Sequence, residues 1–476
     1  MKNMNKDSFK ISTKKPFYLS DEQIKNIVSR SYQYVALYNI INKYALDRNS
    51  STPTYHWNKV TTHTKLLDHT EQSIARPNND TLYSVAMLDL RGEPIILEIP
   101  AIDSAYVSLQ TSAYDHYITI PLTVRRGDYQ TPKKILFYTA RTPYFDRNIA
   151  GIDQYIEMTG DFVIAFHRVM PHANEPERFE LIKQQMMGIQ LKTLSEYVGN
   201  TSPRYQEVLF PAIGKTDSDV FGSNLLEVMQ FVFNHTTFNP NQYPLDKALL
   251  DAYAPLSVIP GQTWNPTEVA QIDNVRFKQI ALQVQQEQLA LARNQQFTAS
   301  ILPNLFREKA HPGISLDTML FQSVFGPIGL PSDEAIYPPI NTQGGEPMNA
   351  LNDYTVSMTQ STLALANAFW SMTLYDTQNG FFIPNSEKKY SVGLNSGYKL
   401  NPAAGIDIYI AEKQPDGVPK ENWLPINRQD QNLDLVLRIY DPKTEDMKTW
   451  KAPNVEKITA TEGHHLTEAS DNVTVN

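Results

Sequence analysis

Cysteine is absent from the 476 residues of the sequence, which excludes several kinds of chemistry at once. Disulfide frameworks, thiolate nucleophiles and zinc sites built on thiolates all require it. The chain also has no run of about 18 apolar residues, the length that crosses a membrane as a helix. Its formal net charge of -9 is spread over interspersed acidic and basic residues, which argues against nucleic acid as a partner.

Motifs of several large enzyme classes are missing as well. The sequence has no Gly-x-Ser-x-Gly elbow, phosphate-binding glycine loop, dinucleotide fingerprint or His-Glu-x-x-His helix. These absences remove the commonest hydrolase, kinase, Rossmann dehydrogenase and zincin interpretations. His56, His63 and His69 are spaced by seven and six residues, which matches no compact set of metal ligands. We therefore predict no cofactor and no metal.

Two regions of the sequence predict β-strands. Hydrophobic residues make up 41% of the chain and aromatic residues 11%, ample for packed cores in about two to three domains. Short runs rich in β-branched and aromatic residues, separated by Gly, Pro, Asp and Asn, predict mainly antiparallel strands. The expected strands of the first region are 81–90, 95–99, 106–111, 116–122, 135–140 and 161–169. Those of the second region are 354–360, 368–376, 380–383, 406–411 and 433–441.

Helices are expected before and between these regions. Apolar residues recur at helical spacing after a capping box at Ser20 and Gln23, and again in 224–233, 245–253 and 267–294. We therefore expect a β-rich fold with helical insertions, in which two mainly antiparallel β-sandwich or jelly-roll-like domains are joined by a helical segment. The expected parts are a flexible arm at 1–19, an N-terminal β domain with a leading helix at 20–202, a helical connector at 203–330, a C-terminal β domain at 331–460 and a polar tail at 461–476.

One stretch, ARPNNDTLYSVAMLDL at residues 75–90, places many polar side chains directly before an expected strand. Arg76 carries a fixed cation with five donors, and the short polar residues that follow it favour turns. In a structural interpretation, Pro77 starts a rigid turn in which Arg76 and Asp80 are satisfied locally. In a functional interpretation, the planar guanidinium binds a carboxylate or phosphate. The residues alone leave both interpretations open.

Longer segments of the chain resemble a known family. The pattern Arg-Pro-Asn-x-Asp-Thr-x-Tyr begins at Arg76, and GDFVIAFHRVMPHANEPERFELIKQQ follows at 160–185. Between residues 365 and 455 the segments AFWSMTLYD, NGFFIPN, KYSVG, ENWLPI and LVLRIYDPK appear in that order. The first set resembles the DUF1254 domain and the second its usual companion DUF1214, both of uncharacterised function. The resemblance implies two β-barrel or jelly-roll-like domains joined by helices.

The cellular location is expected to be cytoplasmic. Residues 1–19 are basic and lack the apolar core of a secretory signal. Members of the family that the chain resembles commonly begin with such a signal, so the resemblance keeps a periplasmic or secreted location open.

Candidate site residues come from both motifs and from the segment AYDHYITIPL. The catalytic candidates are Arg76, Asp80, Tyr83, Asp115 and Tyr117. The candidates for ligand binding are Arg76, Asn78, Asn79, Thr81 and Tyr375. In a regular strand Asp115 and Tyr117 would share one face, and if that face lines a barrel mouth they would act as a base and a hydrogen-bond donor. Otherwise Asp115 is a turn or edge residue. The face of FWSMTLYD that holds Tyr375 either lines a pocket or anchors a corner of the sheet.

Two hypotheses about function follow. The first is a soluble protein with a polar small-molecule pocket near residues 76–83, acting as an enzyme of unassigned class, possibly hydrolase-like in its chemistry. The second is a non-enzymatic, oligomeric jelly-roll protein for binding or assembly. In either case we expect a homo-oligomer without membrane insertion. A concave site of a few hundred cubic ångströms lined by Arg76, Asp80 and Tyr83 would favour the first hypothesis. Full burial and mutual satisfaction of these residues, with no cavity beside them, would favour the structural turn.

Overall fold

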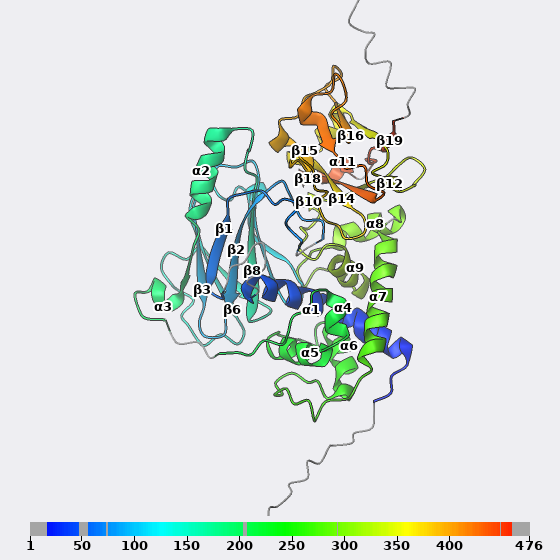
Figure 1. Ribbon diagram of the computed structural model, residues 1–476. Helices are drawn as coiled ribbons and strands as arrows, with labels where there is room; N and C mark the ends of the chain where they lie inside the picture. The colour runs from blue at the N-terminus through cyan, green and yellow to red at the C-terminus, as the bar shows by residue number, and fades with distance from the viewer. Residues whose placement is uncertain are drawn as a thin grey trace, which may run out of the picture.

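The computed structural model describes residues 17–46, 56–72, 75–202, 207–292, 294–447 and 449–458. Two β-rich lobes and a group of helices make up this part of the chain (Figure 1). The expected β-rich fold with helical insertions is confirmed, and so is its two-lobed layout. Most of the expected arm at 1–19 and all of the expected tail at 461–476 lie outside the described residues.

The N-terminal lobe is a sandwich of two sheets. The order of the first sheet is β1 (Lys59–His63), β2 (Leu82–Asp89), β8 (Phe162–Val169), β4 (Val107–Ala113) and β5 (Thr119–Thr123). The order of the second is β7 (Gln154–Met158), β6 (Lys133–Thr139), β3 (Ile95–Ile99) and β9 (Gln190–Thr193). Neighbouring strands are antiparallel, except that β6 and β7 are parallel.

Strand β2 separates two cores, because successive side chains of a strand point to opposite faces. Leu82, Ala86 and Leu88 join the core between the two sheets. Tyr83 and Val85 belong to a second core, which lies between the first sheet and the helices.

Helix α1 (Asp21–Leu46) is buried along most of its length and packs against other helices and against β2. Its start has the expected capping box, since Gln23 Oε1 accepts from the Ser20 amide at 2.9 Å and Ser20 Oγ from the Gln23 amide at 3.3 Å. The other described helices are α2 (Pro176–Met187), α3 (Leu194–Tyr197), α4 (Asp217–Phe221), α5 (Leu225–Asn234), α6 (Pro244–Tyr253), α7 (Asn274–Leu291), α8 (Gln295–Ile301), α9 (Leu316–Phe325), α10 (Gln360–Leu363) and α11 (Thr444–Met447). Among them, none has both the length and the apolar character needed to cross a membrane.

The C-terminal lobe is also a sandwich of two sheets. Its first sheet has the order β10 (Ala335–Ile336), β18 (Asn432–Pro442), β14 (Ala366–Asp376) and β15 (Ser391–Gly393), and β18 also pairs with β11 (Pro339–Ile340) and β12 (Met348–Asn349). The order of its second sheet is β17 (Trp423–Pro425), β16 (Ile406–Ala411), β13 (Tyr354–Met358) and β19 (Glu456–Lys457). Within the described residues no sheet of either lobe closes into a barrel. A jelly-roll arrangement stays a prediction.

Strand β18 presents its two faces to different surroundings. Leu433, Leu435, Leu437 and Ile439 enter the core of the C-terminal lobe. The residues between them, from Asp434 to Tyr440, face away from that core. This outward face of β18 meets the N-terminal lobe, and the contact is called the seam below.

Several strand predictions differ from the structure. The strand expected at 116–122 begins only at Thr119, because Tyr114 and Asp115 form a turn and His116 has a φ of +63°. A positive φ is incompatible with an extended strand. The segment expected at 380–383 contributes only an isolated bridge between Tyr375 and Phe382. Strands β1, β7 and β9 were not predicted, since their short, largely polar and half-exposed sequences give little apolar alternation.

Candidate functional site

The motif that begins at Arg76 lies in the seam and docks onto the C-terminal lobe. The Arg76 amide donates to Gly380 O at 2.7 Å, and its Nη2 forms an ion pair of 2.5 Å with Asp434 Oδ2. Tyr375 donates its hydroxyl to Pro77 O at 2.5 Å. Backbone and side chains of the motif are therefore both held by the other lobe.

The remaining motif residues extend this contact. Asn79 Oδ1 accepts from Ser391 Oγ at 3.0 Å, and Asp80 Oδ2 accepts from Ser371 Oγ at 2.5 Å. Asp80 is 2% exposed, and burial raises its pKa against the opposing charge of Arg438. The polar motif of the first domain and the Ser371–Tyr375 segment of the second thus meet directly.

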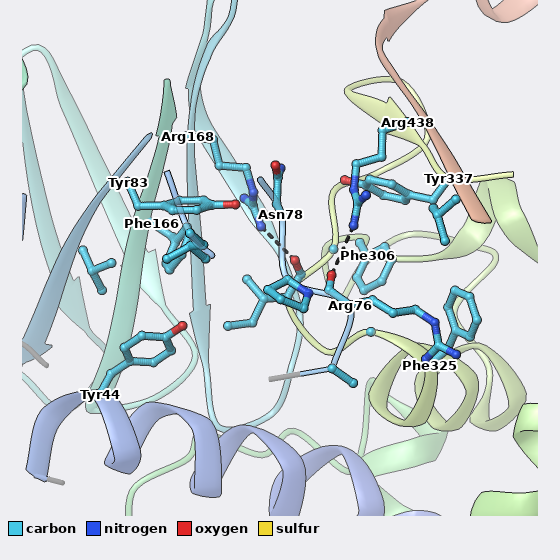
Figure 2. A pocket seen from close by; sticks show the side chains of 18 residues that line it. Tyr44, Arg76, Asn78, Tyr83, Phe166, Arg168, Phe306, Phe325, Tyr337 and Arg438 are labelled. Atoms are coloured by element: carbon cyan, nitrogen blue, oxygen red, sulfur yellow. Dashed lines mark hydrogen bonds between the residues drawn. The ribbon is translucent and has the colours of Figure 1, made fainter. Parts of the chain in front are cut away.

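Local geometry explains why this sequence turns where it does. Arg76 has a φ of +52°, and Pro77 fixes its own φ directly afterwards. Asn78 Oδ1 then accepts from the Asp80 amide at 2.5 Å, the side-chain bond of an Asx turn. The chain enters β2 two residues later, with Tyr83 pointing back toward the seam (Figure 2).

A cavity of about 120 Å³ lies in the seam beside this turn, and both lobes and the helical segment contribute to it. Its apolar walls include Tyr44, Leu67, Val85, Phe166, Phe306, Phe325 and Ile328. Its polar walls include Arg76, Asn78, Tyr83, Arg168, Tyr337 and Arg438. Figure 2 shows Arg168 and Arg438 on two sides of Asn78, with Tyr44 and Phe166 farther from Arg438. We call this space the seam cavity.

Arg168 enters the seam cavity from β8 of the N-terminal lobe. Its Nη1 donates to Gln110 Oε1 at 2.5 Å and its Nη2 to Ile328 O at 2.8 Å. The guanidinium carbon lies 5.0 Å from the centre of the Phe166 ring. Both hydrogen-bond partners are neutral, and in the described part of the chain no carboxylate forms an ion pair with this arginine.

Arg438 enters from β18 of the C-terminal lobe and is 4% exposed. Its Nη2 donates to Tyr375 OH at 2.6 Å and to Arg76 O at 3.1 Å. Its Nη1 is buried, and among the described residues it has no hydrogen-bond partner. Leaving a charged donor buried without a partner costs more free energy than losing an ordinary hydrogen bond.

Two tyrosines of the cavity wall are affected by both arginines. Burial raises the pKa of Tyr83 to about 12, and the charges of Arg168 and Arg438 oppose this rise. Burial also raises the pKa of Tyr337, again against the charges of Arg168 and Arg438. The two tyrosines come from different lobes, and both line the seam cavity together with the two arginines.

The site residues expected from the sequence fall into three groups. Arg76, Asn78 and Tyr83 line the seam cavity. Asp80 and Tyr375 lie behind its wall, where they contact Ser371, Pro77 and Arg438. Asn79 donates to Leu67 O at 2.5 Å, and Thr81 is fully buried. Neither Asn79 nor Thr81 lines the cavity.

Asp115 and Tyr117 lie elsewhere, and the reasoning that paired them on one strand face was wrong because this segment is a turn. Asp115 Oδ1 accepts from Thr159 Oγ1 at 3.0 Å, and its Oδ2 has no partner in the described residues. The carboxylate interacts with Lys309, whose Nζ bonds Asp246 Oδ2 at 2.7 Å. Burial raises the pKa of Asp115 to about 6, and Lys309 and Thr159 oppose this rise.

The histidines give no metal centre. His69 Nδ1 bonds the Tyr390 hydroxyl at 2.7 Å, and burial lowers the pKa of His63. Across the described ranges, no group of three or more His, Asp or Glu side chains is placed to hold a metal ion.

The most polar parts of the cavity were missed by sequence reasoning. Arg168 and Arg438 each stand inside an otherwise apolar strand, FVIAFHRV and NLDLVLRIYDP. A charged residue within such a strand is rarely buried without a specific partner, so it marks a site. The aromatic walls Tyr44, Phe306 and Tyr337 come from distant segments and carried no local signal.

Comparisons with known proteins give a family and a fold. Residues 57–191 match the model of the protein of unknown function DUF1254, and residues 334–444 match that of the protein of unknown function DUF1214. No curated protein matches the chain. The solved VPA0106 protein from Vibrio parahaemolyticus is 20% identical with a TM-score of 0.67, over 92% of this chain and 100% of its own. A putative uncharacterized protein from Burkholderia cenocepacia is 13% identical with a TM-score of 0.43, over 93% of this chain and 96% of its own.

The likeness to the Vibrio protein extends the shared fold over both lobes and the helices between them. The two family matches cover the strands that bring Arg168 and Arg438 to the seam. Both motifs that meet there lie inside the matched ranges. The chain belongs to the family of proteins of unknown function that carry the DUF1254 and DUF1214 domains.

Proposed function

We propose that the protein binds a small anionic molecule in the seam cavity. The observation that carries this proposal is Arg438, which lines the cavity and whose buried Nη1 has no hydrogen-bond partner in the described residues. A planar guanidinium with a free donor is suited to an anion with oxygen acceptors. Arg168 supports the proposal, since its described partners are neutral.

The shape and lining of the cavity favour a ligand over a purely structural joint. Ligand sites are typically concave, mostly apolar, and provided with a few convergent polar groups. The seam cavity has this composition, with mainly apolar and aromatic walls that also include the guanidinium groups of Arg168 and Arg438. Arg76, by contrast, has its charge matched by Asp434 and supports the structure of the seam.

Binding is better supported than catalysis. Among the residues that the structure describes, no Asp, Glu, His, Ser or Lys side chain lines the seam cavity, and the titratable groups on its walls besides the arginines are the phenols of Tyr44, Tyr83 and Tyr337. Tyr83 is held in its neutral form by burial, which raises its pKa to about 12. The two carboxylates among the catalytic candidates, Asp80 and Asp115, do not line the cavity.

Thermal unfolding with added anions tests this proposal. A ligand that binds only the folded protein stabilises it by about 2.7 kcal/mol at about 100 times its Kd. We expect a small anion to raise the unfolding temperature of the wild type and to raise that of Arg438→Met much less. The matched control is Arg428→Met, because Arg428 pairs with Asp353 and Glu412 and does not line the cavity. Equal stabilisation of all three proteins would contradict the proposal.

A homo-oligomer also remains a prediction, and the mass of the protein in solution is its test. A monomer at micromolar concentration would rule out the assembly hypothesis and leave the seam cavity unaffected.

A further inference from the structure

The charges around the seam cavity set the charge of its ligand. This inference rests on the proposed function and concerns the kind of anion that the site binds. Arg76 is neutralised by Asp434 at 2.5 Å. Arg168 has neutral hydrogen-bond partners, and the carboxylate whose charge acts on Arg438 is Asp80. Counted with Asp80 as a carboxylate, whose Oδ2 accepts from Ser371 Oγ at 2.5 Å, the two cations leave an excess of one positive charge.

One negative charge on the ligand removes this excess, whereas two would reverse it. An uncompensated charge in an apolar, water-poor space is costly whichever sign it has. Arg438, whose buried Nη1 has no described partner, lines the cavity together with Arg168, Tyr83 and Tyr337. These groups can therefore bind one planar anionic group.

The apolar walls of the cavity determine the chemical character of the rest of the ligand. Tyr44, Phe166, Phe306 and Val85 offer it rings and methyl groups, and the Arg168 guanidinium carbon lies 5.0 Å from the centre of the Phe166 ring. An apolar cavity of about 150 Å³ is large enough for benzene. The seam cavity, at about 120 Å³, therefore has room for an anion of about six non-hydrogen atoms.

We propose that the ligand is a small monocarboxylate with a compact apolar body, bound with its carboxylate between Arg168 and Arg438 and its body against Tyr44, Phe166 and Phe306. A dicarboxylate would place its second charge among these aromatic rings. Inorganic phosphate would leave them without an apolar partner.

A set of matched probes tests this inference by isothermal titration at pH 7.5. The probes are 2-methylpropanoate, its neutral isostere 2-methylpropanamide, the dianion methylmalonate and inorganic phosphate. We expect 2-methylpropanoate to bind at least about tenfold more tightly than the other three, since a hydrogen bond to a charged group is worth about a factor of ten or more. Arg438→Met should lose this preference, and Arg428→Met should keep it.

The outcomes separate the two proposals. If methylmalonate or phosphate binds more tightly than 2-methylpropanoate and Arg438→Met abolishes that binding, the monocarboxylate inference is wrong and the anion site stands. If the amide binds as tightly as the acid, or if no probe binds the wild type, both proposals are wrong. Arg168→Met examines the same site from the other lobe, so the test does not depend on the folding of one variant. Unchanged binding in both arginine variants would also overturn both proposals.

Discussion

Arg168 and Arg438 bring positive charge into a seam that is otherwise built from tyrosine, phenylalanine and neutral amides. A buried ion without a matching charge costs the folded state several kcal/mol unless other groups satisfy it. In the described residues the partners of Arg168 are neutral, and Arg438 keeps one donor free. At the scale of single residues, the proposed anion would supply the charge that these two arginines lack among the described residues.

Asp115 gives a prediction about pH that is independent of the cavity. Burial raises its folded pKa from 3.8 to about 6. The folded protein thus holds the proton more tightly, so this contribution to stability is full below pH 3.8 and is lost as pH rises to about 6. A shift of about two pKa units corresponds to about 3 kcal/mol. The free energy of unfolding of Asp115→Asn should therefore rise by about 3 kcal/mol relative to that of the wild type between pH 3.5 and pH 8.

Urea unfolding of both proteins at each pH measures this difference. Burial also lowers the pKa of His116 and of His167 to about 3, which costs stability as pH falls below 6.5 in both proteins. The comparison with the wild type cancels that effect. Thr159→Val should instead lose stability relative to the wild type as pH rises, because it removes the hydroxyl that stabilises the ionised Asp115. A relative stability of Asp115→Asn that does not change with pH would contradict the assignment.

At the scale of elements, the turn at residues 75–81 and the loop around Gly380 form the joint between the lobes. Gly380 accepts the Arg76 amide and has a φ of +75°, and a Cβ there would lie 3.0 Å from Ala75 Cβ. Gly417 has the same φ of +75°, with no neighbour within 4 Å of such a Cβ. A comparison of substitutions at these two glycines therefore separates the cost of backbone strain from the cost of crowding in the seam.

Alanine substitution at these glycines should give different results. Each alanine variant should lose about 1–2 kcal/mol of unfolding free energy, because alanine is strained in the left-handed backbone conformation. Gly380→Ala should lose about 1 kcal/mol more, because the Arg76 segment must shift to make room for the new methyl group. Chemical denaturation of both variants measures the two costs. Equal destabilisation would show that the contact between Gly380 and the Arg76 segment contributes little to the seam.

The sequence predicted individual helices and strands better than it predicted which of them contact one another. The alternation of β2 and the capping box at Ser20 depend on neighbours a few residues apart, so both could be read locally. The turn at Asp115 depends on a left-handed His116, which no apolar pattern reveals. The seam joins Arg76 to Asp434, and only the folded chain brings two such distant segments together. The motif at residues 76–83 was found, but the cations that define the cavity were not.

At the scale of the whole molecule, the seam couples the two lobes through one cavity. The N-terminal lobe supplies Arg168 and Tyr83, the C-terminal lobe supplies Arg438 and Tyr337, and the helical segment supplies Phe306 and Phe325. Figure 1 shows the helices beside both lobes. A ligand held by both arginines would bridge the lobes and stabilise their present arrangement by mass action.

The most direct test of the account is the position of an anion in the seam. Crystals grown with sodium bromide would locate bound bromide by its anomalous scattering. We predict a bromide ion within hydrogen-bonding distance of the Arg168 and Arg438 guanidinium groups in the wild type, and none there in Arg438→Met. Bromide found only at other positions, with the seam cavity of the wild type holding water alone, would contradict the central claim that this cavity is an anion site.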